Sequence, residues 1–448
     1  MHVVHCIDTE GPLHESLETK FERLQMIFGI SMEPTAENLE KLVKGEIDLG
    51  GKEEIVRQTF SSHLTNFMDD WTKLGAMLDR AMSEGFRNEV RDSFGGGWVY
   101  SWFCVDHVDY TVNPRRRTIG YHAIFDHYRE LLNHPANRRD GLHWHMHPMS
   151  VYREAHRCAT SFLNSPHALE VLARRIIERR WFPSCFRAGF QAERPDLHWF
   201  LEQYVPFDFS NTSEEDSSQT LQHADLGGGR SGDWRLAPRD WGVYHPSHDQ
   251  YQIPGNCRRW IARALNVLNR FASIDAMEVE KAFRQAQEGK PTLLCIASHD
   301  FRDLVPEVRF FRKLMVESGA KFPDVQVKFG EAREAFRSVI GVDTDAPGLE
   351  LAVTLERSPS GLPRRLLVET IQGRVFGPQP FLAIKTRSKR FIHDNFDFTT
   401  DLKSWHYTFD EESVLPEDLD TVGVGASDEH GNICVKVVPA VDTEGKWK

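Results

Sequence analysis

The sequence predicts a mostly parallel α/β domain followed by a smaller antiparallel β domain. Short apolar strands alternate with helical patterns up to about residue 340, and alternating strands separated by turns come after residues 343–348. The length of 448 residues agrees with this division, because a chain of this size exceeds one ordinary domain. We therefore expect one domain over residues 1–342 and a second over residues 349–448.

The elements of the first domain follow in order along the chain. An apolar strand, HVVHCI at 2–7, comes first. Residues of about 15–92 then carry apolar side chains at three-to-four spacing, which predicts an inserted set of amphipathic helices. Beyond this insertion, buried strands and helices alternate. They include a strand in SFGGGWVYSWFCVDH (93–107), helices in GYHAIFDHYRELLNH (120–134) and PHALEVLARRIIERR (166–180), and a strand in PTLLCIASHDF (291–301).

The second domain is predicted from a series of strands in which apolar and polar residues alternate. These strands are LELAVTLERS (349–358), RRLLVETIQG (364–373), FLAIKTRS (381–388), WHYTFDEE (405–412) and NICVKVVPA (432–440). Such alternation is typical of an antiparallel sheet with one buried face, so we expect this domain to be entirely β.

The composition argues against several classes of protein. A net charge of −12 is unlike that of a nucleic-acid or anionic-membrane binder. No apolar run approaches the roughly 18 residues needed for a membrane span, and MHVVHCIDTEG at the start does not resemble a secretion signal. Seven scattered cysteines without a CxxC pair favour free thiols in a reducing compartment. We expect a cytoplasmic protein; its oligomeric state stays open.

Polar residues follow four of the predicted strands at their carboxyl ends, which is where α/β folds place their sites. The segments are IDTEG (7–11), HWHMH (143–147), FRAG (186–189) and ASHD (297–300). Together they supply carboxylates, imidazoles and an arginine at strand ends of one α/β region. They are the strongest candidates for a functional site.

Three histidines occupy alternate positions in HWHMH. On an extended backbone His143, His145 and His147 share one face, and on a helical backbone His143 and His147 still meet one turn apart. Because both geometries bring His143 and His147 together, this pair is favoured as metal ligands, and neutral imidazole suits zinc. The alternative is a set of polar strand-end residues bonded to neighbouring backbone.

Carboxylates, an arginine and a further histidine complete the candidate chemistry. Asp8 and Glu10 lie on one side of an extended strand end, so one can bind a cation while the other stays available as a base; an acidic turn is the alternative. Arg187 could pair with a carboxylate. His299 could act as a general acid, because its ordinary pKa lies near neutrality.

These segments resemble the polysaccharide deacetylase superfamily, the NodB-type carbohydrate esterases. The resemblance rests on IDTEGP (7–12), HWHMH (143–147), FRAG (186–189) and SHDF (298–301), in that order, and covers roughly residues 1–340. In that family a distorted (β/α)₇ barrel holds a divalent metal, usually zinc, in an Asp-His-His site. A second aspartate is the base that activates water, an arginine tethers it, and a late histidine protonates the leaving amine.

Carried over to this chain, the resemblance implies one role for each candidate residue. Asp8 is the base, Arg187 its tether and His299 the acid, while Glu10, His143 and His147 hold the metal. Glu10 replaces the aspartate that is usual in the family. His145 has no counterpart there, so the pair of histidine ligands could be 143 and 147 or could include 145. The helical insertion could cover the site and restrict the substrate.

Other segments of the first domain could contact a substrate. Trp234, Trp241 and Tyr244 could form a platform on which a sugar stacks, or they could be core residues beneath a loop. The basic run PRRR (114–117) is best explained as solvated, with binding of an anionic substrate group as the alternative. Asp106 and His107, at another strand end, could line the pocket.

We therefore expect a metal-dependent hydrolase that removes an N-acetyl group, or less favourably an O-acetyl group, from a sugar or glycan precursor. A hydrolase acting on a non-sugar C–N bond, such as that of a cyclic amide or ureide, would use the same metal site. A glycan-binding protein without activity is the alternative from another class. Bound metal without hydrolysis would favour this last possibility.

Overall fold

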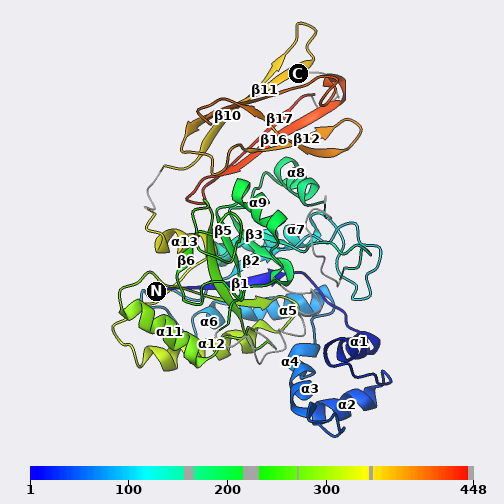
Figure 1. The fold of residues 1–448 in the computed structure, drawn as a ribbon, viewed down its shortest axis with the longest axis vertical. Helices are drawn as coiled ribbons and strands as arrows, with labels where there is room; N and C mark the ends of the chain where they lie inside the picture. Colours follow the sequence, from blue (N-terminus) through cyan, green and yellow to red (C-terminus); the bar gives the residue numbers. More distant parts are fainter. Residues whose placement is uncertain (156–164, 166, 215–231, 270–271, 343–346, 442–448) are drawn as a thin grey trace.

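A closed barrel of parallel strands forms the centre of the molecule (Figure 1). The computed structural model describes residues 1–155, 165, 167–214, 232–269, 272–342 and 347–441. β1 pairs with β8 on one side and with β2 on the other, which closes the ring. In spatial order the ring contains β1 (His2–Thr9), β2 (Ser101–Cys104), β3 (Gly141–Met146), β4 (Cys185–Ala188), β5 (Phe207–Asn211), β7 (Trp260–Asn266) and β8 (Leu293–His299). The prediction of an α/β barrel is confirmed.

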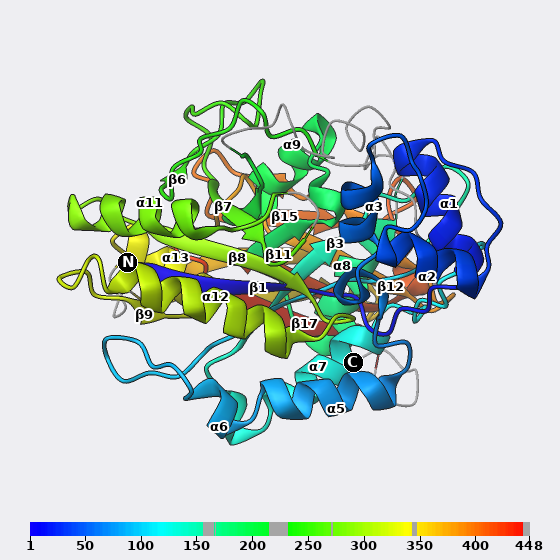
Figure 2. The same ribbon diagram turned by 90° about the horizontal axis from the view of Figure 1, so that it is seen from below.

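Two short strands extend this sheet, and helices cover its outside. β6 (Val243–Tyr244) pairs antiparallel with β7, and β9 (Lys328–Phe329) pairs with the start of β1. Figure 2 shows α5, α11 and α12 along one side of the barrel. The helices around the barrel are α5 (Trp71–Ala81), α7 (Ala123–Leu132), α8 (His167–Arg179), α9 (Pro195–Tyr204), α11 (Ala276–Gln287), α12 (Leu304–Gly319) and α13 (Ala332–Val339).

Strand β8 is apolar along its length because both of its faces are covered. Leu293, Cys295 and Ala297 face the barrel interior, while Leu294 and Ile296 belong to the core beneath the outer helices. On α13, Ala332, Ala335 and Phe336 pack among the interior residues at the end where the strands begin. The polar residues that follow the strands therefore gather at the opposite end.

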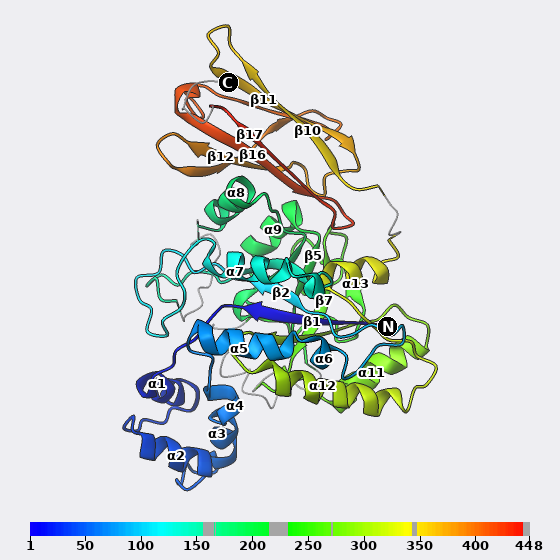
Figure 3. The ribbon, with the colours of Figure 1, turned by 180° about the vertical axis from the view of Figure 1, so that it is seen from behind.

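The segment predicted as a helical insertion divides into two parts. The helices α1 (Leu17–Phe28), α2 (Ala36–Lys44), α3 (Glu53–Thr59) and α4 (Ser62–Thr65) share a small core of their own, whereas α5 and α6 (Glu84–Arg87) pack on the barrel. In Figure 3, α1–α4 lie beside the end of the barrel toward which β1 points. Phe67, which follows α4, packs against Phe301 after β8, with ring centroids 5.2 Å apart.

The chain after residue 347 forms two four-stranded antiparallel sheets within the described residues. They pack face to face over an apolar core and lie at the opposite end of the molecule from α1–α4 (Figure 1). One sheet contains β10 (Glu350–Arg357), β11 (Pro363–Gln372), β15 (Ser404–Thr408) and β14 (Asp397–Phe398). The other contains β13 (Phe391–Asp394), β12 (Phe381–Thr386), β16 (Leu419–Ser427) and β17 (Ile433–Pro439). The second sheet packs on α8 of the barrel.

Two expectations from composition can be compared with this structure. In the described part of the chain, no helix combines the length and the apolar character that a membrane span requires. The six described cysteines are buried and form no disulfide, which confirms the prediction of free thiols for these positions. Cys158, part of the boundary at 343–348 and residues 442–448 lie outside the described residues.

Candidate metal centre

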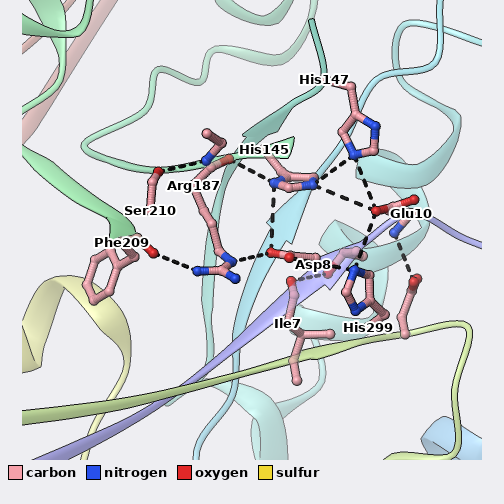
Figure 4. Close-up of polar contacts among 12 residues, drawn as sticks. Ile7, Asp8, Glu10, His145, His147, Arg187, Phe209, Ser210 and His299 are labelled. Atoms are coloured by element: carbon pink, nitrogen blue, oxygen red, sulfur yellow. Dashed lines mark hydrogen bonds and ion pairs between the residues drawn. The ribbon is translucent and has the colours of Figure 1, made fainter. Parts of the chain in front are cut away.

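The polar strand ends meet at one end of the barrel (Figure 4). Neighbouring strands place Asp8 of β1 opposite His299 of β8, and His145 of β3 opposite Arg187 of β4. Because the ring is closed, these two pairs face the same interior space. The structure thus brings together residues that are up to about three hundred positions apart in the sequence.

Glu10, His145 and His147 point three ligand atoms at one another. The Nε2 atoms of the two histidines are 3.0 Å apart, and Oε1 of Glu10 lies 3.8 Å from Nε2 of His145 and 3.3 Å from Nε2 of His147. Ligands about 2.0–2.1 Å from a tetrahedral zinc ion are separated by about 3.3 Å. All three side chains are buried. The group could therefore hold a divalent metal ion with modest adjustment.

Hydrogen bonding fixes which nitrogen of His145 can serve as a ligand. Its Nδ1 donates to the carbonyl oxygen of Arg187 at 2.8 Å, so in the neutral ring Nε2 keeps its lone pair. Burial by itself lowers the pKa of His145, but the neighbouring carboxylates of Asp8 and Glu10 raise it above its ordinary value. Burial dominates at His147 and lowers its pKa, which favours the neutral ring that a metal requires.

Glu10 is held from two sides. Nη1 of Arg117 lies 2.6 Å from its Oε2, and the carboxylate of Asp300 accepts hydrogen bonds of 2.9 Å from the backbone amides of Glu10 and Gly11. Burial alone would raise the pKa of Glu10, but Arg117 and His147 hold it well below its usual range. No charged group of the described residues pairs with Asp300, and burial raises its pKa to about 7. Glu10 is thus a fixed, ionised ligand.

Asp8 has the partner that the sequence suggested. Nε of the buried Arg187 donates to Oδ1 of Asp8 at 2.8 Å, and Nη1 donates to the carbonyl of Phe209 at 2.6 Å. Burial would raise the pKa of Asp8, yet the charges of Arg187, His145 and His299 lower it. The expected contact is therefore present, and Asp8 is an ionised carboxylate beside the candidate ligands.

His299 faces Asp8 and Glu10 from β8. Its Nε2 lies 3.8 Å from Oδ2 of Asp8 and 3.9 Å from Oε1 of Glu10. Its side chain is 19 % exposed, more than those of Asp8, Glu10 and the two ligand histidines. Burial is the largest cause that lowers the pKa of His299 to about 4, so its ring is neutral at pH 7. His299 is thus the member of this group that is most accessible to solvent.

His143, which the sequence favoured as a ligand beside His147, is not part of the group that faces Glu10. Nε2 of His143 lies 3.1 Å from Oε2 of Glu331, and its ring packs on Phe103 deeper in the barrel. Residues two apart on a strand share a face but are separated by roughly 6.6 Å along it. His143 therefore lies below the site, while the chain after β3 returns His147 to the side of His145.

Trp234, Trp241 and Tyr244, for which the sequence left a sugar platform and core packing open, are buried. The polar side-chain atom of each residue donates a hydrogen bond to a backbone carbonyl. Trp234 Nε1 donates to Gln191 at 2.9 Å, Trp241 Nε1 to Glu278 at 3.0 Å, and the Tyr244 hydroxyl to Tyr251 at 3.0 Å. The alternative, core packing beneath a loop, describes these residues.

Asp106 and His107 lie beside the centre but do not enter it. Asp106 pairs with Arg175. It also lines, with Trp144 and His147, a cavity of about 10 Å³, which is close to the space of one water molecule. The buried ring of His107 has its centroid 5.9 Å from that of His147. Asp106 and His107 therefore lie next to His147 without belonging to the group of candidate ligands.

Sequence reasoning missed Arg117, Asp300 and Gly189. Arg117 ends the run expected to be solvated, but it is buried against Glu10. Asp300 directly follows His299, and its carboxylate accepts a hydrogen bond from the backbone amide of Glu10. Gly189 leaves room for His147, because a Cβ there would lie 2.1 Å from Cδ2 of that ring. Asp300 and Gly189 lie within the segments ASHD and FRAG, and this position was the only sign of their roles in the sequence.

Comparison of the chain with family models, curated proteins and solved structures gives no match. The function is therefore inferred from the site itself.

Proposed function

We propose that the protein is a metal-dependent hydrolase that removes an N-acetyl group from a sugar or glycan precursor, on a barrel of the polysaccharide deacetylase type. An O-acetyl group is the second choice of substrate. The observation that carries the proposal is the convergence of Glu10, His145 and His147 beside Asp8, which Arg187 holds. Each polar group that amide hydrolysis needs has a candidate within this one site.

Glu10, His145 and His147 would hold the metal, most plausibly zinc, because two imidazoles and one carboxylate suit that ion. A bound divalent cation supplies Lewis acidity, which polarises a carbonyl and lowers the pKa of water. The long side chain of Glu10, where the resembled family has aspartate, is accommodated because Arg117 takes its second oxygen. His145 thus replaces His143 in the ligand set inferred from the sequence.

Asp8 would serve as the base that takes the proton from the attacking water. Its Oδ1 is engaged by Arg187, which leaves Oδ2 on the side of His299. A carboxylate with a low pKa can accept this proton because the water is acidified by the metal. Arg187 keeps Asp8 ionised and fixed, since its own guanidinium is anchored on the carbonyl of Phe209.

His299 would pass a proton to the leaving amine. Its ring is neutral in the free site because its pKa is lowered to about 4. The proton must therefore be one taken up during the reaction, and Asp8 is the nearest carboxylate, 3.8 Å away. Because His299 is more exposed than Asp8, Glu10 and the two ligand histidines, it would contact a substrate that enters from solvent.

The test is metal content together with acetate release from a panel of N-acetylated sugars. We expect about one zinc per chain and release of acetate. Asp8→Asn should retain zinc and lose roughly 10²- to 10⁴-fold in rate, the range for loss of a general base. Failure to bind any divalent metal would refute the proposal. Bound metal without hydrolysis would favour a binding protein, and ammonia or a ring-opened product would indicate another C–N substrate.

A further inference from the structure

Arg117 differs from the two arginines that precede it. Arg116 is exposed, and Arg115 lies 3.5 Å from Glu15 at the start of the helical insertion. Arg117 is only 7 % exposed and is turned into the candidate metal centre. Asn113 fixes this turn, since its side-chain amide donates to the carbonyl of Arg117 and its Oδ1 accepts from the Arg117 amide. The buried placement of Arg117 is thus built into the loop.

The contact with Glu10 does not use the whole guanidinium. Nη1 forms an ion pair with Oε2 of Glu10 at 2.6 Å, but both Nη1 and Nε are buried and neither makes a hydrogen bond within the described residues. An arginine offers five N–H donors in a planar fork that matches carboxylate and phosphate oxygens. A buried N–H donor without an acceptor destabilises the protein. Binding of an acceptor group to the Arg117 guanidinium would remove this cost.

The charges of the site favour a negatively charged acceptor. Asp8 and Glu10 each already have a guanidinium partner, Arg187 and Arg117. A divalent cation adds two positive charges to this buried space. Even with Asp300 ionised behind the backbone of Glu10, these described groups leave one positive charge of the cation unbalanced. Burying an unbalanced charge is costly, so a ligand that brings negative charge is favoured.

Arg117 is also linked through Phe301 to His299, the most exposed side chain of the site. Its guanidinium lies over the ring of Phe301, 5.2 Å from the centroid. Phe301 is two residues from His299, whose ring packs against it with centroids 4.8 Å apart. His299 is more exposed to solvent than Asp8, Glu10 and the two ligand histidines. A group that reaches the ligand atoms past His299 therefore comes close to Arg117.

We propose that Arg117 binds an anionic group of the substrate, a carboxylate or a phosphate close to the acyl group that is hydrolysed. The substrate class would then be an acidic or phosphorylated N-acetyl sugar instead of a neutral one. This inference rests on the proposed metal-dependent hydrolase for its reaction. The anion site itself depends only on Arg117 and on the charge that the cation brings.

The first experiment titrates the zinc-loaded protein with inorganic phosphate and with acetate by calorimetry. Arg117→Gln should weaken binding of the preferred anion at least tenfold. The matched control, Arg116→Gln, removes an equal charge from the same loop and should leave the affinity unchanged. The anion that binds with the higher affinity, phosphate or acetate, indicates whether the substrate group is a phosphate or a carboxylate. Equal affinities in the two variants, or absence of anion binding by the unaltered protein, would overturn the proposal.

The second experiment distinguishes two roles of Arg117, namely binding an anion and holding the Glu10 carboxylate in place. Because Arg117 also holds Glu10, zinc is restored to one ion per chain in every variant before the titration. An anion affinity that returns to that of the unaltered protein once Arg117→Gln is reloaded with zinc would overturn the proposal. kcat/KM is compared for neutral N-acetyl sugars and their uronate or 6-phosphate forms. Arg117→Gln should remove the preference for the charged forms. Anion binding without hydrolysis of any sugar would retain the anion site and refute the hydrolase.

Discussion

The Nε2 atoms of His145 and His147 lie 3.0 Å apart and face Oε1 of Glu10. Two imidazole nitrogens this close are stabilised when a cation lies between them. We predict that His145→Ala and His147→Ala each weaken zinc binding by more than the roughly 10- to 100-fold typical for losing a hydrogen-bond partner of a ligand. Elemental mass spectrometry and competition with a zinc chelator measure this loss.

His143→Ala provides the matched control, since it removes an imidazole from the same strand. His143 contacts Glu331 and not the ligand group, so the variant should bind zinc like the unaltered protein. Loss of zinc in His143→Ala with retention in His145→Ala would refute the ligand set and restore the pair suggested by the sequence. Circular dichroism shows whether each variant is folded.

Gly189 is predicted to be necessary for the position of His147. A Cβ at this residue would lie 2.1 Å from Cδ2 and 2.8 Å from Cα of His147. Gly189→Ala should therefore displace the ring and weaken zinc affinity at least tenfold. Gly75→Ala is the control, because nothing lies within 4 Å of its Cβ and alanine favours a helix. Equal zinc affinity in both variants would contradict this prediction.

The barrel could be predicted from sequence only in part. Buried strands such as β8 were visible as apolar runs, but β7 was not, because Arg263 interrupts its sequence. The structure neutralises this arginine with Glu278 on α11, through two contacts of 2.7 Å. A pair formed by folding leaves no local pattern. A charged residue inside a buried strand therefore interrupts the apolar pattern by which the strand would be recognised in the sequence.

The residues of the candidate metal centre could likewise be predicted from the sequence only in part. Strand-end positions identified Asp8, Glu10 and Arg187 correctly as neighbours, because the carboxyl ends of parallel strands meet. The choice between His143 and His145 depends on how deep each residue lies in the tilted barrel. That depth follows from the pairing of β3 with both neighbours, which a single sequence does not reveal.

Stability below pH 5 should depend on Glu331. Burial would raise its pKa, but hydrogen bonding to His143 and the charges of His143 and Arg333 lower it from 4.5 to about 2. A lowered pKa stabilises the folded state above the unfolded pKa, and this contribution of about 3 kcal/mol is lost as pH falls from about 5 toward 2. Glu331→Gln should thus be less stable at pH 7, and the difference should narrow in acid.

Urea unfolding of both proteins at pH 7, 5 and 3.5 measures this difference. A gap in the free energy of unfolding that stays constant with pH would show that the substitution acts through lost capping of α13 instead. Glu331 also accepts from the amides of Arg333 and Glu334, so part of the loss at pH 7 is expected to be independent of pH. Glu334→Gln, at a half-exposed position of α13 where the carboxylate pairs with Lys328, is the control for the change of charge.

The packing of the C-terminal sheets on the barrel should depend on Gly425. This residue of β16 faces α8, and a Cβ would lie 2.7 Å from Cδ2 of Phe182 and 2.8 Å from Cδ1 of Ile176. Both side chains are fully buried and have little room to move. Gly425→Ala should lower the free energy of unfolding by about 1–3 kcal/mol, the usual cost of overpacking. Gly348→Ala, where a Cβ meets nothing within 4 Å, should change it by less than about 0.5 kcal/mol. Equal urea unfolding curves for the two variants would show that α8 and β16 can separate slightly without cost, and that the close approach does not hold the two parts together.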